Sequence, residues 1–218
     1  MSDRIAQPMR GMPRADARDM TTEKAPLSAL DAIYQRHATR AYKPDRVDKK
    51  VIGTLLQAAV HAPTAMHLEP WAFVVVQDRA LLSRISDRAK ALAQTPRGSD
   101  HRELARTTTR AVARLSDPAF NIFYDAGTLI VICGKPMGPF VSADCWLAAE
   151  NLMIAATARG YATCPIGFAL PALADPETKA ELGIPPDVTA YAAIIVGVAA
   201  APVPAQARRE PQILSWKE

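Results

Sequence analysis

A chain of 218 residues, 49% of them hydrophobic, is long enough to bury one large core and too apolar to be disordered over most of its length. Its formal net charge of +4 and aromatic content of 6% argue against a nucleic-acid-binding protein, in which positive charge usually gathers on one face. No apolar run approaches the ~20 residues that cross a bilayer, so no membrane span is expected.

Composition divides the chain into three parts. Residues 1–25 mix Arg, Asp, Pro and Met without apolar periodicity, which predicts a flexible arm. Acidic residues within this arm argue against a transit peptide, and no apolar segment suits secretion. No Gly/Ser-rich linker interrupts residues 26–200, so we expect one domain there. Residues 201–218 contain three prolines before residue 212 and predict an extended C-terminal arm.

The cysteines and histidines offer no recognisable metal site. Cys133, Cys145 and Cys164 show neither a C-x-x-C pair nor metal-ligand spacing, and each lies among apolar residues. We therefore expect three buried, reduced thiols and a cytoplasmic protein.

Caps and a 3.6-residue periodicity predict the helices, beginning with one that Ser28 caps and that ends near Arg36. Its apolar residues Leu30, Ile33 and Tyr34 are expected to face the core. Further helices are expected at residues 48–62, from residue 78 onward, and at 100–115, 142–159 and 176–182. The helix at 142–159 is apolar almost all round, which is typical of a central helix or of one at a subunit interface.

Three apolar segments predict strands, at residues 71–76, 127–133 and 188–198. The continuous apolar run at 127–133 predicts a strand that is buried on both faces. Helices that alternate with buried strands predict an α/β or α+β sandwich around a small sheet.

Two short segments carry the strongest functional signal. Residues 36–40, Arg-His-Ala-Thr-Arg, place two arginines just after the first predicted helix, and residues 62–71 form a proline-bounded loop that runs into a strand. A guanidinium is a planar fork that matches phosphate geometry, so these arginines, with Arg208 and Arg209, are candidates for binding a phosphorylated cofactor. The alternative is a positively charged helix C-terminus and a solvated tail.

Several motifs in one order resemble the FMN-dependent nitroreductase family. They are the Arg-His-x-Thr-Arg segment, the Ala-Pro-Thr loop that ends in Pro-Trp, residues 147–156, residues 160–168 and the basic tail, and they span roughly residues 27–213. The resemblance implies an α+β fold in which helices flank a small central mixed sheet as a three-layer sandwich. It also implies an intertwined homodimer with FMN at the subunit interface.

The resemblance assigns roles to the basic residues. Arg36 and His37 would hold the phosphate and ribityl chain of FMN, and Arg40 would lie at the pyrimidine edge of the ring, where reduced flavin carries negative charge. One residue of the pair Arg208 and Arg209, with Arg209 preferred, would add a phosphate contact.

The loop after the second helix is implied to reach the flavin that the partner subunit mainly binds, through Pro63, Thr64 and His67. The sequence departs from the family pattern here, because His67 stands where Asn is typical and Glu69 stands in place of Gln. Ala38, also assigned to the flavin site, stands where Ser is common. An unpaired buried carboxylate is costly, so we expect Glu69 to be partnered or solvated. A plain helix-to-strand connector is the alternative.

Pro165, Ile166 and Gly167 are implied to lie against the reactive nitrogen of the flavin. There a backbone N–H would donate a hydrogen bond, and glycine would permit close approach. An ordinary turn after a strand is the alternative.

Arginines recur every four residues along the helix expected at 100–115, at Arg102, Arg106, Arg110 and Arg114. Such a row is usually a solvated face. The alternative is that this helix covers the flavin and attracts the phosphates of a nicotinamide donor.

The sequence therefore predicts an FMN-dependent oxidoreductase that takes hydride from NADPH or NADH and passes it to a small acceptor, such as a nitroaromatic or a quinone, in a ping-pong sequence. The chemistry would lie on the flavin, so no catalytic side chain is expected. Three alternatives stay open. They are another reaction on the same fold (dehalogenation, enoate reduction or oxidation), a non-catalytic flavin-binding protein, and a nucleic-acid-associated protein that uses the arginine row.

Overall fold

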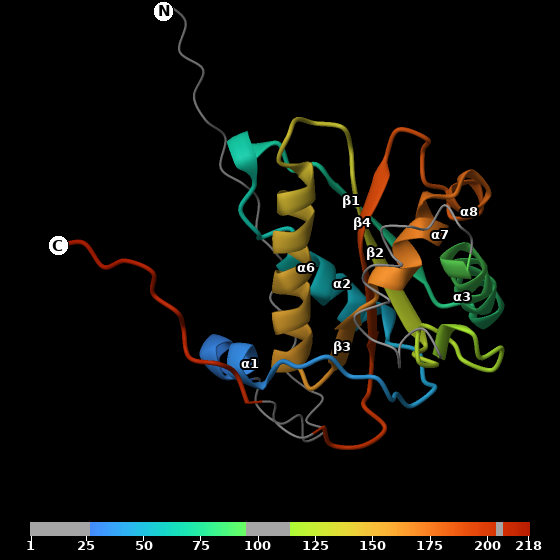
Figure 1. Cartoon of the computed structure of the whole chain (residues 1–218), viewed down its shortest axis with the longest axis horizontal. Coiled ribbons are helices and arrows are strands. Elements are labelled where there is room, and N and C mark those ends of the chain that lie inside the picture. The colour runs from blue at the N-terminus through green and yellow to red at the C-terminus, as the bar shows by residue number, and fades with distance from the viewer. Residues whose placement is uncertain (1–26, 95–113, 204–206) are drawn as a thin grey trace, which may run out of the picture.

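The computed structural model describes residues 27–94, 114–203 and 207–218, and Figure 1 shows how they are arranged. Four strands form one sheet in the order β1-β2-β4-β3, with β1 at Trp71–Val76, β2 at Thr128–Gly134, β3 at Ala162–Pro165 and β4 at Thr189–Gly197. Neighbouring strands all pair antiparallel. Within the described residues, the expected mixed character of the sheet is confined to one parallel bridge, between Ala38 and Thr163 at the edge of β3. The predicted arm at 1–25 and most of the helix expected at 100–115 lie outside the described residues.

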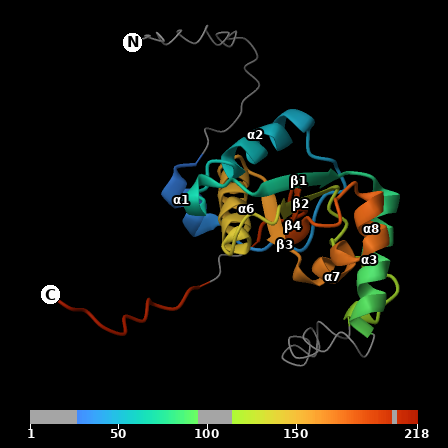
Figure 2. The ribbon, with the colours of Figure 1, turned by 90° about the horizontal axis from the view of Figure 1, so that it is seen from above.

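Helices cover both faces of the sheet, which gives the expected α+β three-layer sandwich (Figures 1 and 2). One layer contains α1 (Ala29–Gln35), α2 (Lys49–Ala59) and α6 (Val141–Ala158), and the other contains α3 (Arg79–Gln94), α7 (Leu170–Ala174) and α8 (Pro176–Glu181). Two short 3-10 helices, η1 (Ala65–His67) and η2 (Gly167–Ala169), lie in the connections. No helix in the described segments is long and apolar enough to cross a membrane.

The central strands divide their side chains between two hydrophobic cores. Because successive residues of a strand point to opposite faces, Ile130 and Ile132 of β2 pack with α2 and α6, whereas Leu129 and Val131 pack with α3 and α7. Every residue of β2 is buried, so the prediction of a strand covered on both faces is confirmed.

The first helix is capped as predicted, but the prediction that its large apolar residues face the core is wrong. The Ser28 side chain accepts a hydrogen bond from the backbone N–H of Asp31 at 3.2 Å. However, Leu30, Ile33 and Tyr34 are exposed by 64%, 47% and 81%, and only Ala32 is buried. The helix lies on the outer side of α6 and touches its own domain along a narrow stripe, so its large apolar residues point away from the core.

The three cysteines are free and buried, as expected. Burial raises the pKa of Cys133 to about 11 and the pKa of Cys145 to about 12. Both thiols therefore stay protonated at neutral pH and behave as small apolar side chains.

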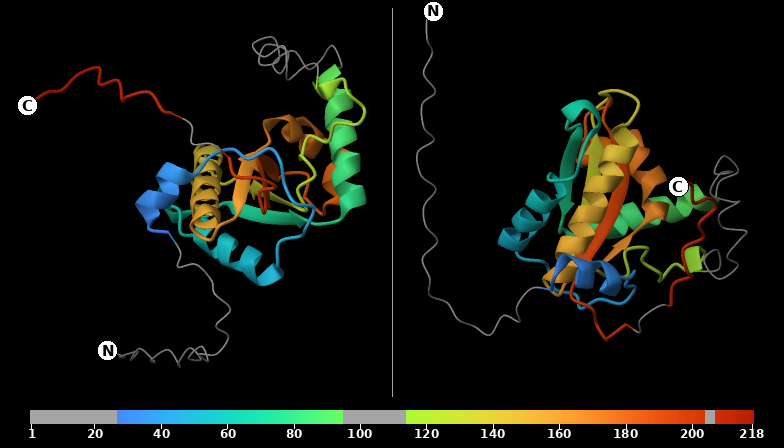
Figure 3. Two further views of the ribbon diagram at one scale, coloured as in Figure 1. Left: turned by 90° about the horizontal axis from the view of Figure 1, so that it is seen from below. Right: turned by 90° about the vertical axis from the view of Figure 1, so that its left-hand side faces the viewer.

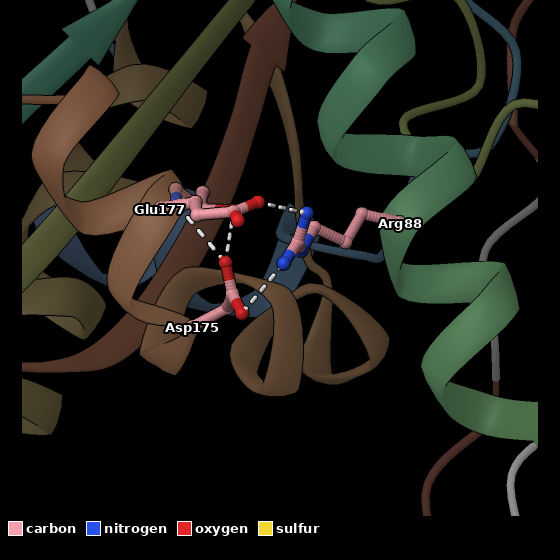
Figure 4. Close-up of polar contacts among 4 residues, drawn as sticks. Arg88, Asp175 and Glu177 are labelled. Atoms are coloured by element: carbon pink, nitrogen blue, oxygen red, sulfur yellow. Dashed lines mark hydrogen bonds and ion pairs between the residues drawn. The ribbon is translucent and has the colours of Figure 1, made fainter.

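An ion-pair network ties α3 to the start of α8 (Figure 4). Arg88 donates to Asp175 at 2.7 Å and to Glu177 at 2.8 Å, and Asp175 also caps α8 by accepting from the backbone N–H of Thr178 at 3.1 Å. Burial alone would raise the pKa of Asp175, but the hydrogen bonds from Thr178 and Arg88 outweigh it and lower that pKa below its usual 3.8. This carboxylate therefore contributes stability that is present above about pH 4 and is lost as the pH falls through the lowered pKa.

Replacing Asp175 separates its two roles. Asp175→Ala removes the cap and the charge, and we expect it to lower the free energy of unfolding by about 1 kcal/mol in urea titrations at pH 7. Asp175→Asn keeps a good capping residue, so its loss should be smaller. Glu177→Gln is the matched control, because this 81% exposed carboxylate should contribute almost nothing. Equal losses for Asp175→Ala and Glu177→Gln would show that the cap is unimportant.

Candidate functional site

The basic segment at residues 36–40 runs along the free edge of β3. Arg36 already has extended backbone angles, with φ −61° and ψ 127°, at the end of α1. The backbone N–H of Thr39 then donates to the carbonyl of Thr163 at 3.1 Å, beside the bridge between Ala38 and Thr163. In an extended segment alternate side chains point to opposite sides, so Arg36 and Arg40 are expected on one side and His37 and Thr39 on the other.

The surroundings of Cys164 support this arrangement of the arginines. Burial raises the pKa of the Cys164 thiol, and the positive charges of Arg40 and then Arg36 oppose that rise. Both charges thus act on this thiol, and the parallel bridge between Ala38 and Thr163 places Arg36 toward the start of β3 and Arg40 toward its end. Arg36 also lies 3.6 Å from the Glu150 carboxylate, measured from Nε to Oε1, whereas Arg40 has no ion pair among the described residues.

A mainly apolar hollow of about 270 Å³, which we call the main pocket, lies beside the turn after β3. It brings together Arg40, the turn after β3 and a segment that precedes β2. Its described lining residues are Arg40, Arg114, Leu115, Phe120, Ile122, Tyr124, Cys164, Pro165, Ile166, Gly167, Phe168 and Leu170. The predicted residues Arg40, Pro165, Ile166 and Gly167 thus meet in one place.

The turn after β3 presents an open backbone surface to the main pocket. The N–H of Ile166 is used within the sheet, donating to the carbonyl of Ala193 at 2.8 Å. Gly167 is exposed and begins η2, so its own N–H has no acceptor within that helix and none elsewhere among the described residues. Apart from its two chain neighbours, no described residue has an atom within 4 Å of where a Cβ on Gly167 would be. A flat ligand could therefore approach this N–H closely.

His37 faces a second hollow, of about 460 Å³, on the other side of the segment. Its ring nitrogen Nδ1 lies 2.8 Å from the carbonyl of Gln35, which fixes the ring. Thr39, Lys43 and residues 198–203 line the same hollow. The structure therefore does not bring His37 together with Arg40, although the two residues are only three positions apart.

The loop that contains Pro63, Thr64 and His67 lies elsewhere. It is held at the start of α6, where the backbone N–H of Ala65 donates to Oδ1 of the buried Asp144 at 3.1 Å. Figures 1 and 3 show that this loop and α1 lie at opposite ends of α6. Within one chain the loop therefore does not join the main pocket.

The backbone of this loop is unusual. Met66, His67 and Glu69 have φ values of 57°, 54° and 46°, in the left-handed region that side chains other than glycine rarely adopt. Glu69 is exposed, so the expectation that its carboxylate is partnered or solvated is confirmed. Its backbone N–H makes a long contact of 3.5 Å to the Thr64 hydroxyl.

Arg208 and Arg209 lie on the exposed C-terminal arm, which leads away from its own domain (Figure 3). The structure does not bring them together with Arg36 and Arg40 in the same chain. Of the arginine row, Arg102, Arg106 and Arg110 lie outside the described residues, and Arg114 lines the main pocket.

Two pocket residues had no sequence signal. Phe120 and Tyr124 belong to an irregular segment in which Tyr124 and Asp125 have left-handed φ values of 53° and 58°. Their rings meet edge to face, with centroids 5.4 Å apart, and the Arg114 guanidinium lies over both. No spacing or periodicity in the sequence predicts this cluster.

Comparisons with known proteins agree with the motif-based assignment. The family model described as the nitroreductase family matches residues 33–198. Protein DrgA of Synechocystis is 30% identical over 167 residues, which cover 68% of this chain and 76% of that protein.

Solved structures agree as well. A nitroreductase with bound FMN from Bacteroides fragilis has a TM-score of 0.74 at 25% identity, over 88% of this chain and 100% of that chain. One from Desulfitobacterium hafniense, also with bound FMN, has a TM-score of 0.73 at 22% identity, over 87% and 98%. The family resemblance and the α+β fold are thereby confirmed, and the chain belongs to the nitroreductase family.

Proposed function

We propose that the protein is an FMN-dependent oxidoreductase that takes hydride from NADPH or NADH and reduces a small acceptor, such as a nitroaromatic or a quinone, in a ping-pong sequence. The observation that carries this proposal is the meeting of Arg40 and the free N–H of Gly167 at one apolar pocket. Family membership supports the same reaction class.

The residues around the main pocket fit FMN chemically. Arg36 and Arg40 offer two guanidiniums to an anionic cofactor, and Arg40 is the one that lines the pocket. The N–H of Gly167 is a donor without an acceptor, and a side chain at this position would fill the space that a flat ring needs. When bound, FMN supplies the ring that accepts and releases hydride. The protein then binds, orients and tunes that ring, and no side chain needs to act as acid or base.

We assign the FMN contacts accordingly. Arg36 is the proposed phosphate ligand, Arg40 the proposed cation at the pyrimidine edge, and Gly167 the proposed donor to the reactive nitrogen. A fixed cation beside the pyrimidine favours the negatively charged reduced ring and so helps hydride transfer to it. His37 faces the second hollow and is left out of this set.

We further propose that the working unit is a homodimer. The loop at residues 62–69 and the segment at 36–40 lie at opposite ends of α6, so a second copy would have to supply the loop to any one flavin (Figure 3). Through Pro63, Thr64 and His67, each loop would reach the flavin of the partner, and Arg209 on the outgoing arm would do the same.

Exposed apolar side chains support this dimer. Trp146 and Leu147 on α6 are exposed by 41% and 45%, and the large residues of α1 also point outward. On the C-terminal arm, Leu214 and Trp216 are exposed by 90% and 76%. A chain that leaves this much apolar surface uncovered on neighbouring elements is typical of a subunit that pairs with another.

The colour of the purified protein tests the cofactor. We expect a yellow protein with a bound-flavin spectrum, which anaerobic NADPH or NADH bleaches and an added nitroaromatic or quinone restores. Protein that is colourless, fails to take up added FMN and is monomeric would overturn the proposal. Flavin that binds but is not bleached would indicate a non-catalytic flavin-binding protein. Bleached flavin that only a halogenated, enoate or oxygen acceptor reoxidises would indicate another reaction on this fold.

Substitution of the two arginines tests the binding assignment. Arg36→Met and Arg40→Met should each weaken FMN binding by about 10- to 100-fold, because each removes a charge-assisted hydrogen bond. Fluorescence quenching of FMN by the apoprotein measures this affinity. Lys43→Met is the matched control, since it removes the same charge from the side of the second hollow and should have little effect. Equal weakening by all three variants would mean that only the overall charge matters.

Introducing a charge on the exposed face of α6 tests whether the protein forms the proposed dimer. Trp146→Lys should convert the dimer to a monomer in light scattering after gel filtration and should release FMN at the same time, because burying an unpaired charge in an apolar interface is costly. Val75→Lys places the same charge on β1, at a residue exposed by 38%, and should leave both properties intact. A monomeric variant that keeps FMN would contradict the shared site.

A further inference from the structure

The charges of the main pocket have one sign. Among its described lining residues only Arg40 and Arg114 are charged, and no carboxylate is present. Most of the remaining lining is apolar and includes the rings of Phe120 and Phe168. A pocket of this kind favours a flat apolar body that carries a negative charge.

Arg114 is held in place by aromatic stacking. Its guanidinium carbon lies 4.8 Å from the centroid of the Phe120 ring and 5.6 Å from that of Tyr124, and the two rings brace each other edge to face at 74°. Such contacts hold the planar guanidinium while leaving its N–H donors available. No ion pair joins Arg114 to a carboxylate in the described part of the chain.

A second hollow beside Arg114 shows from which side of this guanidinium an anion would bind. Arg40, Arg114, Phe120 and Tyr124 also line a neighbouring hollow of about 300 Å³, but Asp125 lines that one as well. Its carboxylate would repel an anion there. Arg114 can therefore attract an anion more effectively from the main pocket.

We propose that Arg114, stacked on Phe120 and Tyr124, selects planar aromatic acceptors that carry a carboxylate or phenolate. This rests on the proposed function, in which Arg40 serves the flavin and Arg114 is left for the second anion in the same pocket. Arg114 is exposed at the pocket wall, so solvent weakens its attraction, and the preference is expected to be about tenfold rather than absolute.

A pair of acceptors that differ in charge tests this. The substrates are 4-nitrobenzoate and 4-nitrobenzamide, which have nearly the same shape and the same nitro group. The native enzyme should prefer the anion, and Arg114→Met should lower the ratio of their kcat/KM values about tenfold. Arg114→Lys should retain part of the ratio, because it keeps the charge and loses the planar fork. The control is Arg46→Met, which removes an exposed arginine outside the pocket lining and should leave the ratio unchanged.

Binding without turnover provides a second measurement. Calorimetric titration of the flavin-loaded protein with benzoate should give an affinity that falls about tenfold in Arg114→Met, with benzamide affected much less. An unchanged ratio of kcat/KM together with unchanged benzoate affinity would overturn the proposal. So would an equal loss for both acceptors, which would mean a purely structural role.

Kinetics with the hydride donor, NADPH or NADH, separate failure of this inference from failure of the proposed function. If Arg114→Met raises the KM for NADPH and spares the acceptor ratio, Arg114 serves the donor and the inference is wrong. If NADPH and NADH do not bleach the flavin of the native protein, the proposed function fails. The benzoate titration would still report whether Arg114 binds an aromatic anion.

Discussion

A single strand-edge contact positions the candidate site: the pairing of residues 38–39 with Thr163. An edge strand has backbone donors and acceptors that seek partners, and here the chain that leaves α1 satisfies part of that edge. Because β3 ends at Pro165 and continues directly into Ile166 and Gly167, the same contact sets Arg40 beside that turn. The basic segment by itself would be an exposed cationic tail, and the turn by itself an unremarkable loop.

Packing beyond β3 keeps this contact in register. Tyr42 pairs with Ala199 just after β4, and its ring lies against Gly197 so closely that a Cβ there would come within 2.9 Å of it. The segment is thus held by β3 at one end and by the extension of β4 at the other. The bond from the N–H of Ile166 to Ala193 prolongs the ladder past Pro165 and fixes the start of η2. Rigid elements therefore hold both the arginine and the free N–H, as a binding site requires.

Local signals in the sequence explain which parts could be predicted. Ser28 and Asp48 cap their helices by accepting hydrogen bonds from backbone N–H groups only two or three residues further along the chain. The continuous apolar sequence of β2 likewise predicts its burial directly. By contrast β3 is four residues, Ala-Thr-Cys-Pro, without alternation, and it exists because β4 pairs with it. For the site, Arg40 and Gly167 belong to recognisable motifs. Phe120 and Tyr124 lie in an irregular segment, with left-handed backbone at Tyr124 and Asp125, that no spacing rule describes.

The loop at residues 62–69 suggests why a second copy would find its contact surface already formed. Three left-handed residues in four positions are unfavourable unless the surroundings hold them, and the bond from Ala65 to the buried Asp144 supplies such a hold. Met66 is 79% exposed at the tip, so the strain is not offset by burial within the same chain. A loop that is strained, anchored and exposed loses little further freedom when a partner docks, which favours association. Histidine tolerates left-handed backbone better than most residues, so His67 can differ from the family pattern without changing the shape of the loop.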